Sequence, residues 1–198
     1  MRNTEEFKNN PKRLLEKYNL LNVPVDLKKL TESLNITVKE MQLENNLSGL
    51  IEYIPAKDDV SIYIEINDFP KRKNFTIAHE IAHYIYDLDF QTNKENQQIS
   101  DIQMVPRGSK REPIEKRADK FAEQLLMPKD IFHKTVFEVK KDLFQEENNL
   151  GTEKIYKIVN QLSDIFQVSN PAIIVRLSSL SIITESLRAD LFYYHYNS

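Results

Sequence analysis

The chain has 198 residues, of which 40% are hydrophobic and 29% are charged, and its formal net charge at pH 7 is −3. This size suits one globular domain, with or without a small helical extension, and the balanced charge excludes a general preference for nucleic acid or acidic membranes. The sequence has no cysteine, which excludes disulfides and thiolate metal sites, and three glycines are too few for a phosphate-binding loop.

The N-terminal residues carry no apolar core of a secretory signal peptide. No later run of about 18 apolar residues has the length that a membrane span requires. We therefore expect a cytoplasmic protein that does not act at a membrane.

The first elements are two short predicted helices, at residues 3–18 and 26–34, separated by the break Val23-Pro24-Val25. Apolar residues then follow strand patterns at residues 36–41, 47–54 and 61–66. Residues 55–59, with one proline and two aspartates, predict a hairpin turn between the last two strands. These patterns favour a small antiparallel sheet of three strands.

A longer helix is predicted at residues 75–88, with Asn74 or Asp68 as its cap and a stripe of apolar side chains along one face. Residues 90–111 are polar and contain Pro106 and Gly108, which indicates a long irregular connection and a candidate lid over a substrate.

A second helix, at residues 113–127, begins with Pro113 and stops before Pro128. Further helices are expected at 129–145, 152–166 and 170–180, followed by an aromatic tail. The fold class is therefore α+β and mostly helical. We expect one domain at residues 1–145 and a C-terminal helical extension at 146–198 packed on it.

The segment His79-Glu80-Ile81-Ala82-His83 is an H-E-x-x-H sequence inside a predicted helix. Residues four apart on a helix lie on the same face, so both imidazoles can reach one metal ion. Glu80 lies where its carboxylate can take a proton from a metal-bound water, as the general base of a metallopeptidase does. The alternative is a pair of structural histidines on a helix.

A catalytic zinc needs a third protein ligand, and the candidates are Glu115, Asp119, Glu123, His133 and His195. Glu115 borders the apolar stripe of the second helix and forms a like-charge i, i+4 pair with Asp119, which a nearby cation would relieve. Glu115 is then the ligand, and Asp119 accepts a hydrogen bond from an imidazole N–H. The alternative is a solvated acidic face that pairs with Lys116 and Lys120.

These residues resemble the ImmA/IrrE family of zinc metallopeptidases. The resemblance covers much of the chain, in Pro24-Val25-Asp26-Leu27, in Leu47-Ser48-Gly49-Leu50-Ile51, in residues 74–84 and in residues 115–128. It implies a zincin-like, gluzincin-type domain with one Zn²⁺ per chain, held by His79, His83 and Glu115. Ala82 stands where many members have glycine, and Asp119 where many have asparagine.

The resemblance also implies a narrow protein substrate, which is a helix-turn-helix repressor or antitoxin of a mobile-element or stress-response circuit. An alternative is a non-catalytic toxin or sensor module of the same fold that only binds a partner. Residues 162–180 resemble a helix-turn-helix, but Arg176 is the only basic residue on its second helix, so direct DNA binding is not expected. The donor to a transition-state oxyanion stays open among Tyr84, Tyr86, His133 and Arg107.

Overall fold

The computed structural model describes residues 4–44, 47–90, 95–102, 113–145, 147 and 150–197. Its contacts divide the chain into two compact units, Met1–Leu125 and Leu126–Ser198. The sequence places the domain boundary after residue 145 instead. The division falls earlier because the helix after Pro128 packs against the following helix of the second unit.

The N-terminal segment contains a short 3-10 helix, η1 (Glu5–Phe7), and the helix α1 (Pro11–Lys17), where the sequence predicts one continuous helix. The chain breaks at Asn10, whose side chain accepts a hydrogen bond from the backbone N–H of Arg13 at 3.2 Å and caps α1. The next helix, α2 (Leu27–Ser33), is capped by Asp26 in the same way. Both helices bury leucines in the core of the first unit.

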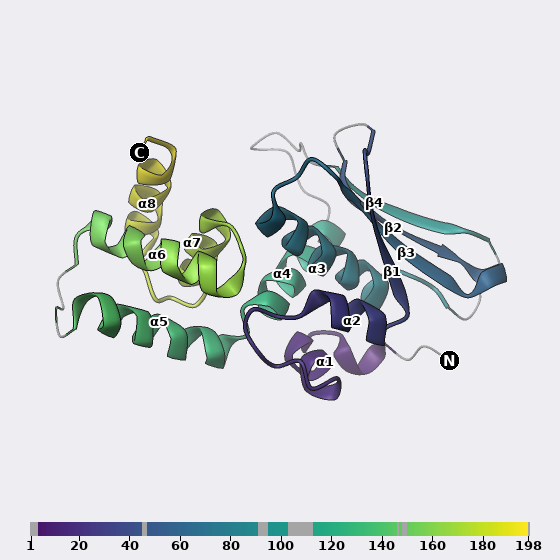
Figure 1. The fold of residues 1–198 in the computed structure, drawn as a ribbon, viewed down its shortest axis with the longest axis horizontal. Helices are drawn as coiled ribbons and strands as arrows, with labels where there is room; N and C mark the ends of the chain where they lie inside the picture. The colour runs from purple at the N-terminus through teal and green to yellow at the C-terminus, as the bar shows by residue number, and fades with distance from the viewer. Residues whose placement is uncertain are drawn as a thin grey trace. The chain divides into compact units, whose positions relative to one another are not determined.

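The sheet has four strands, β1 (Ile36–Met41), β2 (Leu47–Ile54), β3 (Asp59–Glu65) and β4 (Gln97–Ile102), in the order β1-β3-β2-β4 (Figure 1). β2 is antiparallel to β3 and to β4, but β1 is parallel to β3. The prediction of an antiparallel three-stranded sheet is therefore wrong. β1 does not pair with its neighbour in sequence, and hydrophobic alternation contains no information about pairing order.

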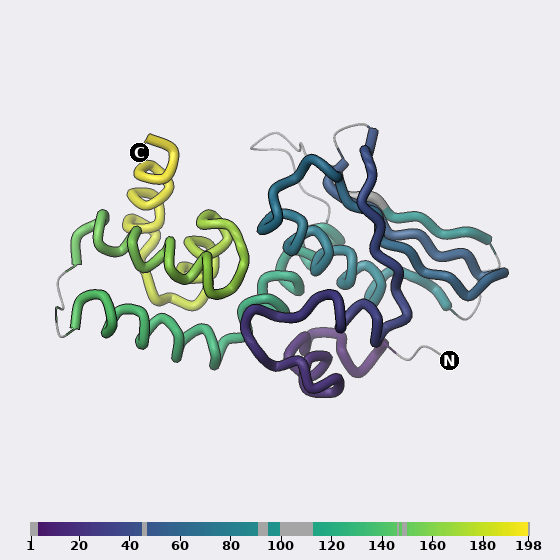
Figure 2. Tube along the Cα trace, viewed as in Figure 1, coloured from purple at the N-terminus to yellow at the C-terminus, as the bar shows by residue number. Residues whose placement is uncertain are grey.

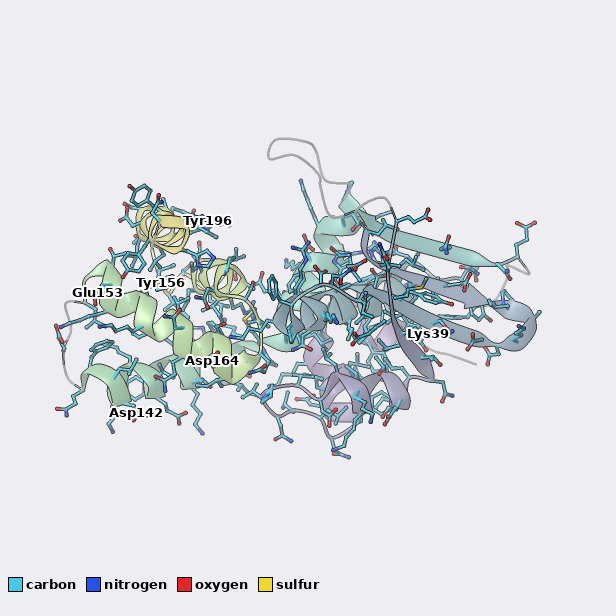
Figure 3. All side chains as sticks on the ribbon, turned by 45° about the horizontal axis from the view of Figure 1, so that its top comes forward. Lys39, Asp142, Glu153, Tyr156, Asp164 and Tyr196 are labelled. Atoms are coloured by element: carbon cyan, nitrogen blue, oxygen red, sulfur yellow. The ribbon has the colours of Figure 1, made fainter. Side chains whose placement is uncertain are left out.

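The hairpin between β2 and β3 is confirmed. It turns through η2 (Pro55–Lys57) and Asp58, which has a positive φ of 48°. Ile51 pairs with Ile62 across this hairpin, and both side chains are fully buried. On β1, Lys39, which Figure 3 labels, places its amine 5.0 Å from the ring centroid of Tyr63 on β3.

The H-E-x-x-H helix, α3 (Pro70–Tyr86), lies against β2 and β3, on the same side of the sheet as α2 (Figure 1). It begins at Pro70 and not at residue 75, because proline suits the first turn of a helix. The first turn of α3 is charged, so the apolar pattern in the sequence does not reveal it. Neither predicted cap is used, since the N-cap residue is Phe69.

The second predicted helix is observed as α4 (Pro113–Leu126). The connection predicted at residues 90–111 contains the strand β4, so it is not wholly irregular. β4 is the last strand in the order of the sheet, and an edge strand can carry polar residues. A search for apolar alternation therefore does not find it. Residues 91–94 and 103–111 of the proposed lid lie outside the described residues.

The C-terminal unit contains α5 (Lys129–Phe144), α6 (Thr152–Phe166), α7 (Asn170–Ser179) and α8 (Glu185–Asn197), which the tube in Figure 2 follows in chain order. Phe132 and Phe166 meet in its core with ring centroids 5.2 Å apart. The aromatic tail forms α8, where Tyr194 packs against Tyr156 of α6. Figure 3 labels Tyr156 and, on α8, Tyr196. No helix in the described ranges has the length and apolarity needed to cross a membrane.

Candidate metal centre

The two histidines of α3 present their ring nitrogens to a common point. They are one helical turn apart, and the Nε2 atoms of His79 and His83 are 3.0 Å from each other. Both side chains are buried where α3 faces away from solvent. The helix therefore places two nitrogen ligands side by side, as the spacing in the sequence predicts.

Glu115 joins this pair from α4. Its Oε2 lies 3.1 Å from Nε2 of His79 and its Oε1 lies 3.5 Å from Nε2 of His83. Ligand atoms around a tetrahedral zinc with bonds of about 2.0–2.1 Å are roughly 3.3 Å apart. Among the described residues, His79, His83 and Glu115 form a group whose spacing fits one such ion.

Each imidazole is also held at its other nitrogen by a carboxylate. Asp119 Oδ1 lies 3.1 Å from Nδ1 of His79, and Asp87 Oδ2 lies 2.9 Å from Nδ1 of His83. A carboxylate accepts hydrogen bonds, so each Nδ1–H donates to its aspartate, and a neutral imidazole protonated at Nδ1 keeps its lone pair on Nε2, the atom that faces Glu115. The Nε2 lone pairs and the Glu115 carboxylate would repel one another, and a positive charge between them, either a proton on Nε2 or a metal ion, removes this repulsion.

The proton affinities show the same preference for positive charge. Burial alone lowers the pKa of the His83 imidazole, but hydrogen bonds to Asp87 and Glu115 outweigh it and raise the pKa to about 9. Hydrogen bonds from His79 and His83 hold the pKa of Glu115 below its ordinary value of 4.5. The donor set thus stabilises a cation, which agrees with a divalent metal ion bound by two imidazoles and one carboxylate.

Glu80 follows His79 on α3 and is 0% exposed. Its carboxylate lies beside Gly49 of β2, where a Cβ atom would be 2.9 Å from Glu80 Oε1 and 2.5 Å from Thr76 Cγ2. Glycine fits here because any larger residue would have to displace the strand, Thr76 or Glu80. The strand β2 therefore shares in setting the position of Glu80.

The structure brings together His79, His83, Glu115 and Asp119 as the sequence predicts, with Glu80 adjacent on the helix. Within the described ranges, the metal group does not include Glu123, and His133 and His195 belong to the C-terminal unit.

The structure describes both tyrosines among the four candidate donors to a transition-state oxyanion. Tyr86 accepts a hydrogen bond at its hydroxyl from the backbone N–H of Asn9 at 2.7 Å, so this hydroxyl is directed to the N-terminal segment. Tyr84 is buried, with its ring 5.2 Å from that of Phe90. Arg107 lies outside the described residues.

Sequence reasoning missed Asp87. The residue is four positions after His83, so the helix spacing that pairs the two histidines also predicts contact between His83 and Asp87. This signal is present in the sequence as His83-x-x-x-Asp87. Its second partner, Arg117, comes from α4 and has no local signal.

Comparison with protein families gives an independent result. The family model Peptidase_M78, described as the IrrE N-terminal-like domain, matches residues 31–178. This match covers more than half of the chain and contains every residue of the candidate metal centre. A search among curated proteins found no match.

Proposed function

Because the chain belongs to the Peptidase_M78 family of IrrE N-terminal-like domains, we propose that it is a zinc-dependent endopeptidase. The observation that carries the proposal is the set of three facing acceptors, His79, His83 and Glu115, beside the buried carboxylate of Glu80. A site that only bound a partner would have no use for a general base at this position.

The residues of the chain divide the chemistry between them. His79, His83 and Glu115 would hold the zinc, which lowers the pKa of a bound water toward about 7 and polarises the scissile carbonyl. Glu80 accepts the proton that the attacking water loses and passes it to the leaving amine. Asp119 and Asp87, each in contact with Nδ1 of one imidazole, would hold the rings in the tautomer that leaves Nε2 to bind the ion.

For the substrate, we propose a helix-turn-helix repressor or antitoxin whose cleavage relieves repression in a mobile-element or stress-response circuit of the cytoplasm. Support for this substrate comes from the resemblance to ImmA/IrrE proteins. The low overall charge and the single basic residue of α7, Arg176, support a protein substrate over DNA.

The metal assignment is tested by elemental analysis of protein purified without chelator. We expect about one zinc per chain in the wild type and in Glu80→Gln, and loss of zinc in His83→Ala and Glu115→Ala. Absence of metal in the wild type, or its loss in Glu80→Gln, contradicts the assignment.

The catalytic assignment needs a second measurement. Candidate repressors incubated with the protein should be cleaved by the wild type and left intact by Glu80→Gln, which keeps its zinc. Partner binding without cleavage by either protein would favour the non-catalytic binding module instead.

A further inference from the structure

Asp87 contacts two different elements at once. One carboxylate oxygen, Oδ2, accepts the hydrogen bond from Nδ1 of His83, and the other, Oδ1, forms an ion pair with Arg117 of α4. The Asp87 side chain is only 15% exposed, so its contact with the fully buried His83 side chain is shielded from solvent, whereas Arg117 remains partly exposed. Asp87 directly follows α3 as its C-cap residue.

Arg117 is itself fixed from a second side. Its guanidinium lies 4.4 Å from the ring centroid of Tyr86, the last residue of α3. One turn further along α4, Phe121 meets the same Tyr86 ring edge-on at 5.8 Å. Arg117 and Phe121 thus form one row of α4 that contacts the end of α3.

A neighbouring row of α4 serves the metal centre. Glu115 and Asp119 are one turn apart and contact the two ring nitrogens of His79. Glu115 and Asp119 form one row of α4, and Arg117 and Phe121 form the other, two residues along the helix. Because a helix is rigid, the position of one row fixes the position of the other. The contact at Asp87 therefore sets where Glu115 lies relative to both histidines.

We propose that the Asp87–Arg117 pair is a positioning clasp for the metal centre, which orients His83 directly and places Glu115 by joining α4 to the end of α3. The inference rests on the proposed zinc site. Neither residue belongs to the proposed ligand set of His79, His83 and Glu115, so both are positioning residues.

A merely structural ion pair makes a different prediction. Arg117 is 40% exposed, and an ion pair of such exposure contributes little to stability by itself. Loss of a structural pair would lower the melting temperature of the metal-free protein and leave zinc affinity unchanged. Loss of a positioning clasp weakens zinc binding, since removal of a partner of a metal-binding histidine typically costs 10–100-fold in affinity.

The chain offers a matched control beside the same helix. Asp68 pairs with Arg72 at 3.2 Å near the start of α3, and its side chain is also 15% exposed. Asp68 lies about three helical turns before His79. Asp68→Asn therefore breaks a comparable ion pair without reaching the metal centre.

The experiment measures the zinc dissociation constant of the full chain by competition with a chromogenic chelator. We expect Asp87→Ala to weaken zinc binding by 10–100-fold and Asp68→Asn to leave it within about 2-fold of wild type. Arg117→Gln should weaken it by a smaller factor, because it loosens Asp87 and α4 without removing the partner of His83.

A variant with both substitutions tests whether Arg117 acts through Asp87 or whether the two residues affect zinc binding independently. If Arg117 acts through Asp87, then Asp87→Ala with Arg117→Gln binds zinc about as weakly as Asp87→Ala alone. The Co²⁺-substituted protein gives a second readout, because a changed ligand geometry shifts its visible absorption in Asp87→Ala but not in Asp68→Asn.

The outcomes are distinguishable. Wild-type zinc affinity in Asp87→Ala, or an equal loss in Asp68→Asn, overturns the clasp and leaves the proposed zinc peptidase standing. A wild-type protein that binds no zinc overturns both.

Discussion

At the scale of the residue, the candidate site depends on close approaches that a sequence motif does not contain. H-E-x-x-H places two imidazoles and a carboxylate on a helix, but the position of Glu80 also depends on Gly49, which belongs to a strand. A Cβ atom on residue 49 would lie 2.5 Å from Thr76 and 2.9 Å from Glu80, and both separations are shorter than van der Waals contact. Gly49 is therefore needed for space.

We predict that Gly49→Ala lowers the free energy of unfolding by about 1–3 kcal/mol, the usual cost of an added methyl group in a packed interior. Thr76→Ser removes the methyl carbon that the new Cβ would meet first. The double variant should recover part of the loss, because the two effects are coupled. Urea denaturation of the four proteins measures this, and a Gly49→Ala protein as stable as wild type would contradict the close approach.

At the scale of the element, strand ends are joined to loops by side chains that accept backbone hydrogen bonds. Glu65 ends β3, and its carboxylate accepts from the backbone N–H of Leu43 at 2.7 Å and of Asn67 at 3.0 Å. These hydrogen bonds, chiefly the one from Leu43, lower the pKa of Glu65 from its ordinary value of 4.5. The ionised form is thus the one that holds the segment after β1 against β3.

A pH dependence with a defined sign follows from Glu65. A carboxyl whose pKa is lower in the folded than in the unfolded state contributes stability above its unfolded pKa, and this contribution disappears as the pH falls through the folded pKa. We expect wild type to exceed Glu65→Gln in stability at neutral pH, with the difference shrinking below about pH 4.5. Chemical denaturation of the metal-free proteins at several pH values tests this, and a constant difference would count against it.

At the scale of the whole molecule, the ligands of the proposed zinc all belong to the unit Met1–Leu125. A ligand that binds the native state stabilises it by about 2.7 kcal/mol at a concentration 100 times its dissociation constant. This stabilisation acts on the structure that must unfold to release the ion. The unit Leu126–Ser198 supplies no ligand among the described residues.

We therefore predict that zinc slows amide hydrogen exchange in α3 and α4 far more than in α6 and α7. Mass spectrometry of the protein with zinc and after chelator treatment measures both units in one sample. The helices of the C-terminal unit serve as the internal control. Equal protection of both units would show that the chain unfolds as one cooperative body.

The local elements of this protein follow from its sequence. Helices at residues 113–126, 129–144 and 152–166 agree with their predicted bounds to within one residue, because apolar periodicity and prolines act over a few residues. The two imidazoles face one another for the same reason, since a single helical turn separates His79 from His83. The contact between His83 and Asp87 follows from the same helical spacing.

Other features depend on contacts between residues distant in sequence, and only the tertiary structure decides them. The parallel pairing of β1 with β3, the strand β4 within a polar connection, the contact of Gly49 with Glu80 and the pairing of Asp87 with Arg117 each join separate elements. Local propensity contains no term for such contacts, because their energy depends on which surfaces the folded chain brings together.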